Sequence, residues 1–235
     1  MSFSIQHFLN CLLTGIRYIP NTVKMTIVVF IISILLGLLV ATIRFYKIPV
    51  LSQFFAVFVT IYLGVPVLLA INVYYLIYVM FYNDIASFLH LNSSIRDANF
   101  AIVAYVTLIL TSSCMMSDTF RGAYSSIAPV QFEAGYSIGM SKPRTLMRII
   151  IPQIFPVVLP NMINWFVNIL KNMSILFVVG IYDIMNGSLI PCADNYSYAE
   201  GYVAAALIYW AVVVIVEYVG NLLEAHSTIY KKVTL

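Results

Sequence analysis

Four polar side chains recur at helical spacing inside an apolar stretch of the sequence: Asn161, Asn164, Asn168 and Lys171. Steps of three and four residues place them on one face of a helix. Amides donate and accept hydrogen bonds and an ammonium donates them, so these groups suit recognition of a polar molecule. An unpaired amide buried in hydrocarbon costs roughly 2–7 kcal/mol, so this face must meet other helices or water rather than lipid. Two interpretations stay open: hydrogen bonding between helices, or the lining of a path for a polar solute.

A second polar stretch, residues 121–148, has the features of a contact surface. Pro129 suits the first turn of a helix, and Glu133 in the early turns complements the positive end of the helix dipole. Gly135 and Gly139 are four residues apart, so both are predicted on one side of that helix. Two glycines cost a short helix about 1–2 kcal/mol relative to alanine, which makes sense if another surface approaches the backbone closely. The alternative is an ordinary amphipathic loop.

Covalent catalysis and metal binding find little support in the residue types. The sequence has neither a glycine-rich phosphate loop with Lys-Ser/Thr nor a His-Glu-x-x-His element. Cys11, Cys114 and Cys192 are far apart in the sequence, with no CxxC pair and no histidine at metal spacing, so we expect unpaired thiols. We expect no cofactor, no metal site and no catalytic residue, and therefore no enzyme activity in this chain.

Apolar helices must position these residues. The chain has 235 residues, of which 62% are hydrophobic and 9% charged, whereas a soluble domain carries roughly 25% charged residues. At about 18–20 residues per crossing, five spans are predicted, near residues 22–43, 51–82, 100–116, 149–170 (with a further apolar stretch at 175–181) and 202–218. The second is too long for a straight crossing, and Gly64 and Pro66 predict a bend in its middle. Pro152, Pro156 and Pro160 predict a bent or partly unwound start of the fourth.

We therefore predict an all-α polytopic membrane protein of about five transmembrane helices, forming one domain over residues 1–235. Its core covers about 20–225, and a cytoplasmic loop covers about 121–148. Most of the basic residues would lie on one face of the membrane: Arg44, Lys47, Arg121, Lys142, Arg144, Arg148, Lys231 and Lys232. Because Lys and Arg concentrate on the cytoplasmic side, we predict the C-terminus in the cytoplasm and the N-terminus outside.

Several short elements share a joint spacing. In chain order, the first element is Asp118-Thr119-Phe120-Arg121-Gly122, and the second is Gln131-Phe132-Glu133-Ala134-Gly135 with Gly139 after it. The third is Ile151-Pro152-Gln153, and the fourth is Lys171-Asn172-Met173-Ser174-Ile175. This arrangement resembles the permease subunits of polar amino acid ABC importers, the histidine, glutamine, arginine and cystine group, whose "EAA" loop docks on an ATPase. The resemblance covers about residues 20–222.

The resemblance implies a type I ABC importer permease fold in the bacterial cytoplasmic membrane. Such a subunit moves a polar amino acid or related solute by alternating access, while ATP is hydrolysed on a partner chain. The residues predicted for ATPase coupling are Gln131, Glu133, Ala134, Gly135 and Gly139. Those predicted for the substrate path are Tyr62, Gly64, Pro66, Asn161, Asn164, Asn168, Lys171 and Ser174. The expected partners are ABC ATPase subunits, a second permease subunit, an extracellular solute-binding protein and the lipid bilayer, with no nucleic acid.

The second span departs from the family pattern. Leu63-Gly64-Val65-Pro66 lacks the family's Arg and Thr, which favours a heterodimer, with this chain as the less orthodox partner, over a homodimer. The alternative function is an ion-coupled secondary transporter that uses Asp118, Lys171 or Glu217. No internal repeat supports it, and both acids fall near the cytoplasmic ends of spans. A membrane enzyme lacks a nucleophile–base pair.

Overall fold

The computed structural model describes residues 3–88, 90 and 95–233. Over these residues the chain is helical and has no strand. Five helical segments there are long and apolar enough to cross a membrane: α2 (Ile19–Phe45), α4 (Val67–Phe88), α5 (Ala101–Ser126), the run Lys142–Val179, and α10 (Tyr198–Val233). Shorter helices complete the fold: α1 (Ile5–Ile16), α3 (Leu51–Leu63), η1 (Ile95–Asp97), α6 (Pro129–Ser137), α9 (Ile184–Leu189) and η4 (Ile190–Ala193). The predicted all-α membrane fold with five spans is confirmed.

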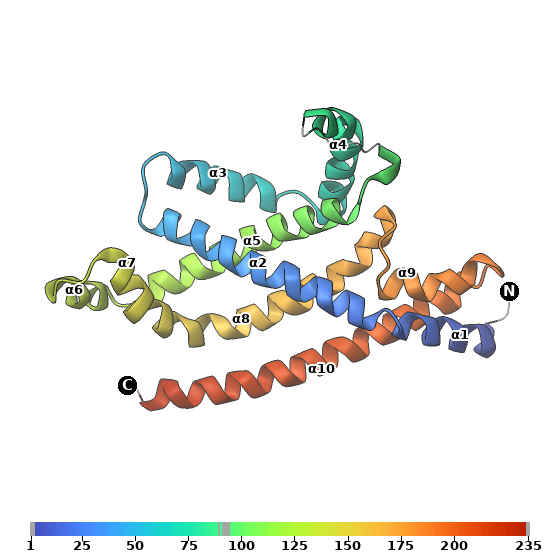
Figure 1. Cartoon of the computed structure of the whole chain (residues 1–235). Helices are drawn as coiled ribbons and strands as arrows, with labels where there is room; N and C mark the ends of the chain where they lie inside the picture. Colours follow the sequence, from blue (N-terminus) through green and yellow to red (C-terminus); the bar gives the residue numbers. More distant parts are fainter. Residues whose placement is uncertain (1–2, 89, 91–94, 234–235) are drawn as a thin grey trace.

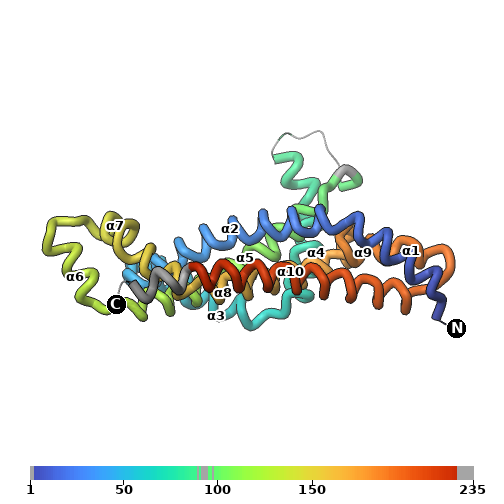
Figure 2. Tube along the Cα trace, turned by 90° about the horizontal axis from the view of Figure 1, so that it is seen from below, coloured from blue at the N-terminus to red at the C-terminus, as the bar shows by residue number. Residues whose placement is uncertain are grey.

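The helices form a long body with α5 at its centre. Figure 1 shows α2, α5, α8 and α10 running along its length, with α3 and α4 on the side away from α10. The apolar window of α5 is 56% buried, the largest share of any span, whereas that of α4 is 11% buried. Figure 2 shows α4 projecting from the long body. Since apolar surface on a membrane protein is covered by lipid or by another protein, α4 offers most of its surface to such a neighbour.

The second apolar stretch divides into two helices. α3 ends at Leu63 and α4 begins at Val67, with Gly64 as the C-cap of α3 and Pro66 leading into α4. Thirteen residues give α3 a length of about 20 Å at 1.5 Å per residue, too short for a bilayer core of about 30 Å. Pro66 has no N–H to continue the α3 ladder, so the break falls where the sequence predicts a bend.

The run from Lys142 to Val179 is a compound helix. It begins as α7 (Lys142–Thr145), passes through a π turn, η2 (Leu146–Ile150), continues as α8 (Ile151–Asn172) and ends as a 3₁₀ segment, η3 (Met173–Val179). Pro152 lies in the first turn of α8, so the carbonyl four residues before it receives no bond from the proline nitrogen, and a wider turn accommodates the gap. The ribbon changes direction here (Figure 1). The start of this span is distorted as predicted, by a π turn rather than by unwinding.

Small residues let α2 and α5 approach closely. At Gly37 of α2, an added Cβ would lie 2.8 Å from Met116 Cβ and 3.1 Å from the carbonyl oxygen of Ser113. The facing side of α5 is rich in small buried polar residues, and the Ser33 hydroxyl donates to the Ile109 carbonyl at 3.3 Å. Close backbone approach with small residues is the usual way in which helices pack inside a membrane, where the hydrophobic effect contributes little.

This contact predicts opposite effects for two identical substitutions. Gly37→Ala is expected to destabilise the protein by about 1–3 kcal/mol, because the methyl group overpacks the contact with α5. Gly122→Ala on α5 is the control: nothing lies within 4 Å of its added Cβ, so the gain in helix propensity, about 0.5–1 kcal/mol, remains. Thermal unfolding of both variants in one detergent checks this, and equal Tm values would contradict the close approach.

The end of the molecule opposite α6 is built from α1, α9, η4 and the beginning of α10 (Figure 1). Asp183 is buried and caps α9, accepting from the backbone N–H of Asn186 at 2.9 Å and from the Tyr209 hydroxyl of α10 at 2.6 Å. The backbone N–H of Ser4 donates to Glu200 Oε1 at 2.8 Å. These contacts tie α1 and α9 to α10 as one unit.

Candidate functional site

The loop between α5 and α7 folds into a short helix, α6. Pro129 is in its first turn, as the sequence predicts, because its fixed φ suits that position. Ala128 precedes it and offers no side-chain cap. Ser125 and Ser126 belong to the end of α5, where their hydroxyls donate to the carbonyls of Arg121 and Ala123.

Gly135 and Gly139 do not share one face of a helix, contrary to the expectation from their spacing. Gly135 is buried against its own chain, where an added Cβ would lie 2.6 Å from Thr145 Cγ2 and 3.3 Å from Ile149 Cδ1. Gly139 lies beyond the helix with φ +78°, and its N–H donates to the Tyr136 carbonyl at 2.9 Å. Because Gly139 has a left-handed backbone conformation that ends the helix, the four-residue spacing from Gly135 no longer places the two residues on one face. Gly135 lets α6 lie against α7 and η2, and Gly139 turns the chain.

The outward side of α6 carries the remaining residues predicted for ATPase coupling. Gln131, Glu133 and Ala134 are all exposed. Two large apolar side chains are also exposed there, Val130 at 60% and Ile138 at 76%. A short helix with exposed aliphatic groups around a carboxylate has the mixed character of a protein contact surface.

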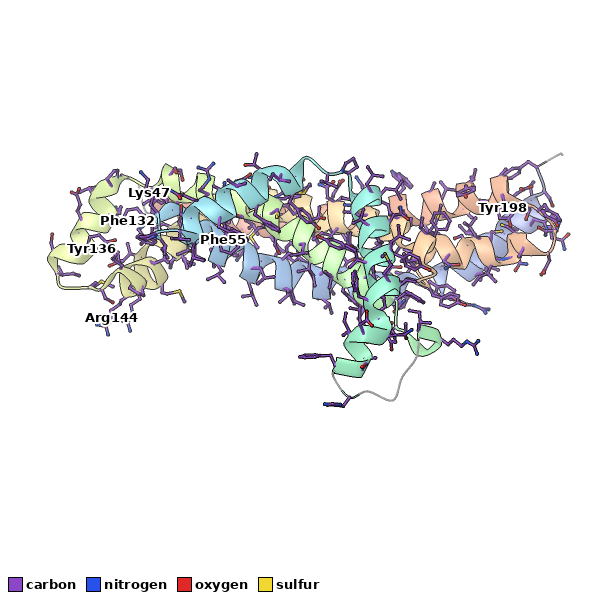
Figure 3. The ribbon with its side chains drawn as sticks, turned by 90° about the horizontal axis from the view of Figure 1, so that it is seen from above. Lys47, Phe55, Phe132, Tyr136, Arg144 and Tyr198 are labelled. Atoms are coloured by element: carbon purple, nitrogen blue, oxygen red, sulfur yellow. The ribbon has the colours of Figure 1, made fainter. Side chains whose placement is uncertain are left out.

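An aromatic cluster joins α6 to the ends of α2 and α5. The Phe132 ring stacks on that of Phe45 at a centroid distance of 5.6 Å, and Phe45 also contacts Tyr124 of α5 at 5.1 Å. Burial raises the pKa of Tyr46, and the neighbouring Tyr136 hydroxyl raises it further, so the Tyr46 hydroxyl is neutral at physiological pH. Figure 3 shows Phe132, Tyr136 and Lys47 together at this end of the molecule. The cluster gives α6 a rigid apolar link to two membrane helices.

An ion pair beside this cluster was not predicted. Arg44 Nη1 lies 2.7 Å from Asp118 Oδ1 and 3.1 Å from Ser117 Oγ, and the Arg44 side chain is only 10% exposed. From the sequence we predicted only a cytoplasmic position for Arg44. For Asp118 we predicted a place in the family motif or, in the alternative function, a role in ion coupling. An arginine at the end of an apolar span indicates a polar partner or the membrane interface, but it does not identify Asp118, which is 74 residues away. The pair fixes α2 against α5 close to α6.

The polar stripe of α8 forms one face that no other helix covers within the described part of the chain. Asn161, Asn164, Asn168 and Lys171 are all exposed, as the spacing predicts for a shared face. Ile169 and Leu170, which project away from this face, are buried in the core. The Asn168 amide donates to the Asn164 carbonyl of α8 itself at 2.9 Å. Among the described residues, neither Asn161 nor Asn164 uses its side chain to bond another helix.

The stripe ends where the helix geometry changes. α8 ends at Asn172 and continues as the 3₁₀ segment η3, and the Ser174 hydroxyl donates to the Lys171 carbonyl at 2.8 Å. A change from α to 3₁₀ hydrogen bonding leaves carbonyl groups that other donors can reach. Lys171 and Ser174 therefore lie together at this junction, next to the amide stripe.

The predicted path residues of the second span lie elsewhere. Tyr62, Gly64 and Pro66 occupy the α3–α4 break, and these helices pack on α2 and α5, whereas α8 packs on α2, α5 and α10. The Tyr62 hydroxyl oxygen is buried, beside the side chains of Tyr74 and Thr111. Within one chain the structure brings together the path residues of α8 and η3 but not those of α3 and α4.

Comparison with known proteins identifies the family and the fold. Residues 33–228 match the family described as "Binding-protein-dependent transport system inner membrane component". The chain belongs to this family. The predicted class, a permease subunit of an ABC importer, is confirmed, and it is favoured over an ion-coupled secondary transporter. The family is a transport component rather than a catalytic subunit, and the five apolar spans make this member a multi-pass membrane protein.

Individual relatives agree with the family. A probable amino-acid ABC transporter permease protein of Vibrio harveyi is 29% identical over 225 residues, covering 96% of each chain. An L-cystine transport system permease protein of Bacillus subtilis is 29% identical over 210 residues, covering 88% of this chain and 84% of the relative. A crystal structure of an amino acid ABC transporter with histidines matches 96% of this chain and 100% of that one, with a TM-score of 0.76 at 23% identity. The MetNI methionine ABC transporter in an inward-facing conformation matches with a TM-score of 0.69 at 13% identity, over 91% and 96% of the two chains. These two structures share the fold.

Proposed function

We propose that this chain, as a single transmembrane permease domain, imports a polar amino acid or a close relative, driven by a separate ABC ATPase. The observation that carries the proposal is α6: an exposed helix with Gln131, Glu133 and Ala134 on its surface, joined to α2 through Phe132 and Phe45. Relatives whose names specify an amino acid or cystine support the solute class.

Basic residues support an orientation with α6 in the cytoplasm. Lys47 and Arg144 lie at the α6 end in Figure 3, and Lys142, Arg121 and Arg44 belong to elements that end there. Positive residues concentrate on the cytoplasmic side of the bacterial inner membrane. The α1 end is then outside, and the C-terminal part of α10, at the other end in Figure 1, is cytoplasmic. An extracellular binding protein would deliver solute to the outer end.

The amide stripe of α8 supports a path between two permease subunits. Exposed amides in the middle of a membrane span are costly in lipid, so a second permease subunit and water would cover Asn161, Asn164 and Asn168. Lys171 and Ser174 extend this lining at the start of η3. The proposed path would include Tyr62, Gly64 and Pro66 only if it also passes the bend between α3 and α4. The non-orthodox second span supports a heterodimer.

The aromatic cluster between α6, α2 and α5 would couple ATP hydrolysis to the movement of the membrane helices. When ATP brings the ATPase subunits together, α6 moves with the surface that it docks on. Phe132 passes that displacement to α2 and α5, and the π turn and prolines at the start of α8 let this helix tilt. The spans then expose the amide stripe alternately to the two sides.

Reconstitution tests the proposal. An affinity-purified preparation from the native membrane is expected to contain an ABC ATPase. Proteoliposomes made from it, with the cognate binding protein outside and ATP inside, are expected to accumulate at least one of radiolabelled glutamine, cystine, histidine or arginine. Uptake by this chain alone, driven by a proton or sodium gradient without ATP, would contradict the proposal and favour a secondary transporter.

A further inference from the structure

Two of the three cysteines meet at the α1 end of the molecule. Cys11 of α1 and Cys192 of η4 are 181 residues apart in the sequence, yet their Sγ atoms lie 3.6 Å apart. Both side chains have no exposed surface. They form a small apolar cluster with Ala204, surrounded by Phe8, Leu12 and Leu189. Cys114 is separate from this cluster, on α5.

The surrounding helices hold the two sulfur atoms in place. α1 packs on α9, η4 and α10, which lie together at this end in Figure 1. From the α10 side, an added Cβ on Gly201 would lie 2.5 Å from Cys192 Sγ, so the backbone of α10 closes over this sulfur. The Cys192 thiol contacts the carbonyl oxygens of Ser197 at 3.2 Å and Ser188 at 3.7 Å. The Cys192 sulfur is therefore enclosed by the α10 backbone and by two carbonyl groups as well as by Cys11.

We propose that Cys11 and Cys192 form a disulfide bond in the mature protein, joining α1 to η4. The proposal rests on the orientation given above, which puts this end of the chain outside the cytoplasmic membrane. Disulfides form and persist in that compartment, whereas thiols in the cytoplasm are kept reduced. The two sulfur atoms are 3.6 Å apart, and a covalent S–S bond of about 2.05 Å would draw them closer by about 1.5 Å.

The oxidant is a thiol–disulfide oxidoreductase in its disulfide form. One cysteine thiolate attacks a sulfur of the oxidant disulfide and forms a mixed disulfide, which releases the first oxidant thiolate. The second cysteine thiolate then attacks the sulfur of the first cysteine, and the second oxidant sulfur leaves. Two electrons pass to the oxidant, and the two thiol protons end on its sulfurs, so the exchange is balanced.

Burial decides when this exchange happens. Desolvation, with Cys192 as the next cause, raises the pKa of Cys11 to about 11, so little thiolate exists at neutral pH once α1 has packed. Because the folded protein buries both cysteines completely, we expect the bond to form while the outer end is still assembling. In the finished protein the same burial keeps reductants away, so the bond persists under native conditions and is reduced only after denaturation.

Counting thiols tests the proposal on the parent protein. Cells are quenched with acid, and the protein is denatured in SDS and treated with a maleimide that adds a fixed mass to each free thiol. One modified cysteine, Cys114, is expected before reduction and three after it. Cys114→Ser is expected to show none before reduction. Cys11→Ser is expected to show two. Three modified cysteines in the unreduced parent would overturn the proposal.

A second measurement tests the orientation of the α1 end independently of the disulfide bond. In a variant without native cysteines, Ile5→Cys places a thiol on the exposed start of α1, where the native side chain is 72% exposed. Labelling of intact spheroplasts with an impermeant maleimide is expected. Labelling only after permeabilisation would overturn the orientation and, with it, the disulfide. Outside labelling together with three free thiols in the parent would overturn the disulfide alone. ATP-driven uptake in proteoliposomes tests the proposed function, and its result does not depend on either labelling experiment.

Discussion

Replacing Glu133 with arginine and Gly139 with tryptophan is expected to abolish ATP-driven uptake while the protein still inserts in the membrane. Glu133 is an exposed carboxylate on the outward side of α6, so arginine reverses the charge of the surface proposed to dock. Gly139 has φ +78°, which a tryptophan adopts only with strain, and its indole would project beside the same surface. A loss of at least about tenfold in ATPase retained by the purified complex corresponds to ~1.4 kcal/mol of docking energy.

Asp84→Arg is the matched control for charge reversal. Asp84 is also exposed, but it lies on α4, at a distance from α6. This variant is expected to retain the ATPase at the parent level during purification. Normal ATPase retention and normal uptake in the α6 double variant would refute the docking role of α6.

Asn168→Leu is expected to lower uptake by about 10- to 100-fold, equivalent to ~1.4–2.8 kcal/mol. The substitution keeps a similar volume but removes one amide from the stripe that we propose as the path. Polar solute and water then meet an apolar patch on this exposed face of α8. Initial rates of uptake in proteoliposomes, together with ATPase retention as a measure of intact assembly, check the prediction.

Asn72→Leu controls for the local hydrogen bond. The Asn72 amide donates to the Leu68 carbonyl at 2.7 Å, as the Asn168 amide donates to the Asn164 carbonyl at 2.9 Å. Both substitutions therefore remove the same type of bond within a helix, but Asn72 lies on α4, outside the stripe. Uptake by Asn72→Leu is expected within about twofold of the parent, a difference under ~0.5 kcal/mol. An equal loss in both variants would attribute the effect to helix stability rather than to the path.

Local signals predicted much of the fold. Apolar runs of sufficient length predicted five spans, Gly64 and Pro66 predicted the break between α3 and α4, and Pro129 predicted the start of α6. Each of these depends on residues that are neighbours in sequence, so a single chain carries the information. The shared face of the α8 asparagines was predictable for the same reason.

Contacts between distant segments were not predictable in this way. The Arg44–Asp118 pair joins residues 74 apart, and the Cys11–Cys192 contact joins residues 181 apart. The burial of Gly135 against Thr145 depends on how α7 folds back on α6, which spacing alone does not give. For Gly139, the spacing rule failed because a glycine favours the left-handed turn that ends a helix over a further helical residue.

The π turn at η2 sets the direction in which α6 points relative to the amide stripe of α8. It lies between α7, on which α6 rests through Gly135, and the amide stripe of α8. A π turn holds one residue more than the α turn that it replaces. One residue rotates a helix by about 100° around its axis. Deleting a single residue from Leu146–Ile150 would therefore leave α6 and the amide stripe of α8 intact, but it would rotate one relative to the other around the helix axis.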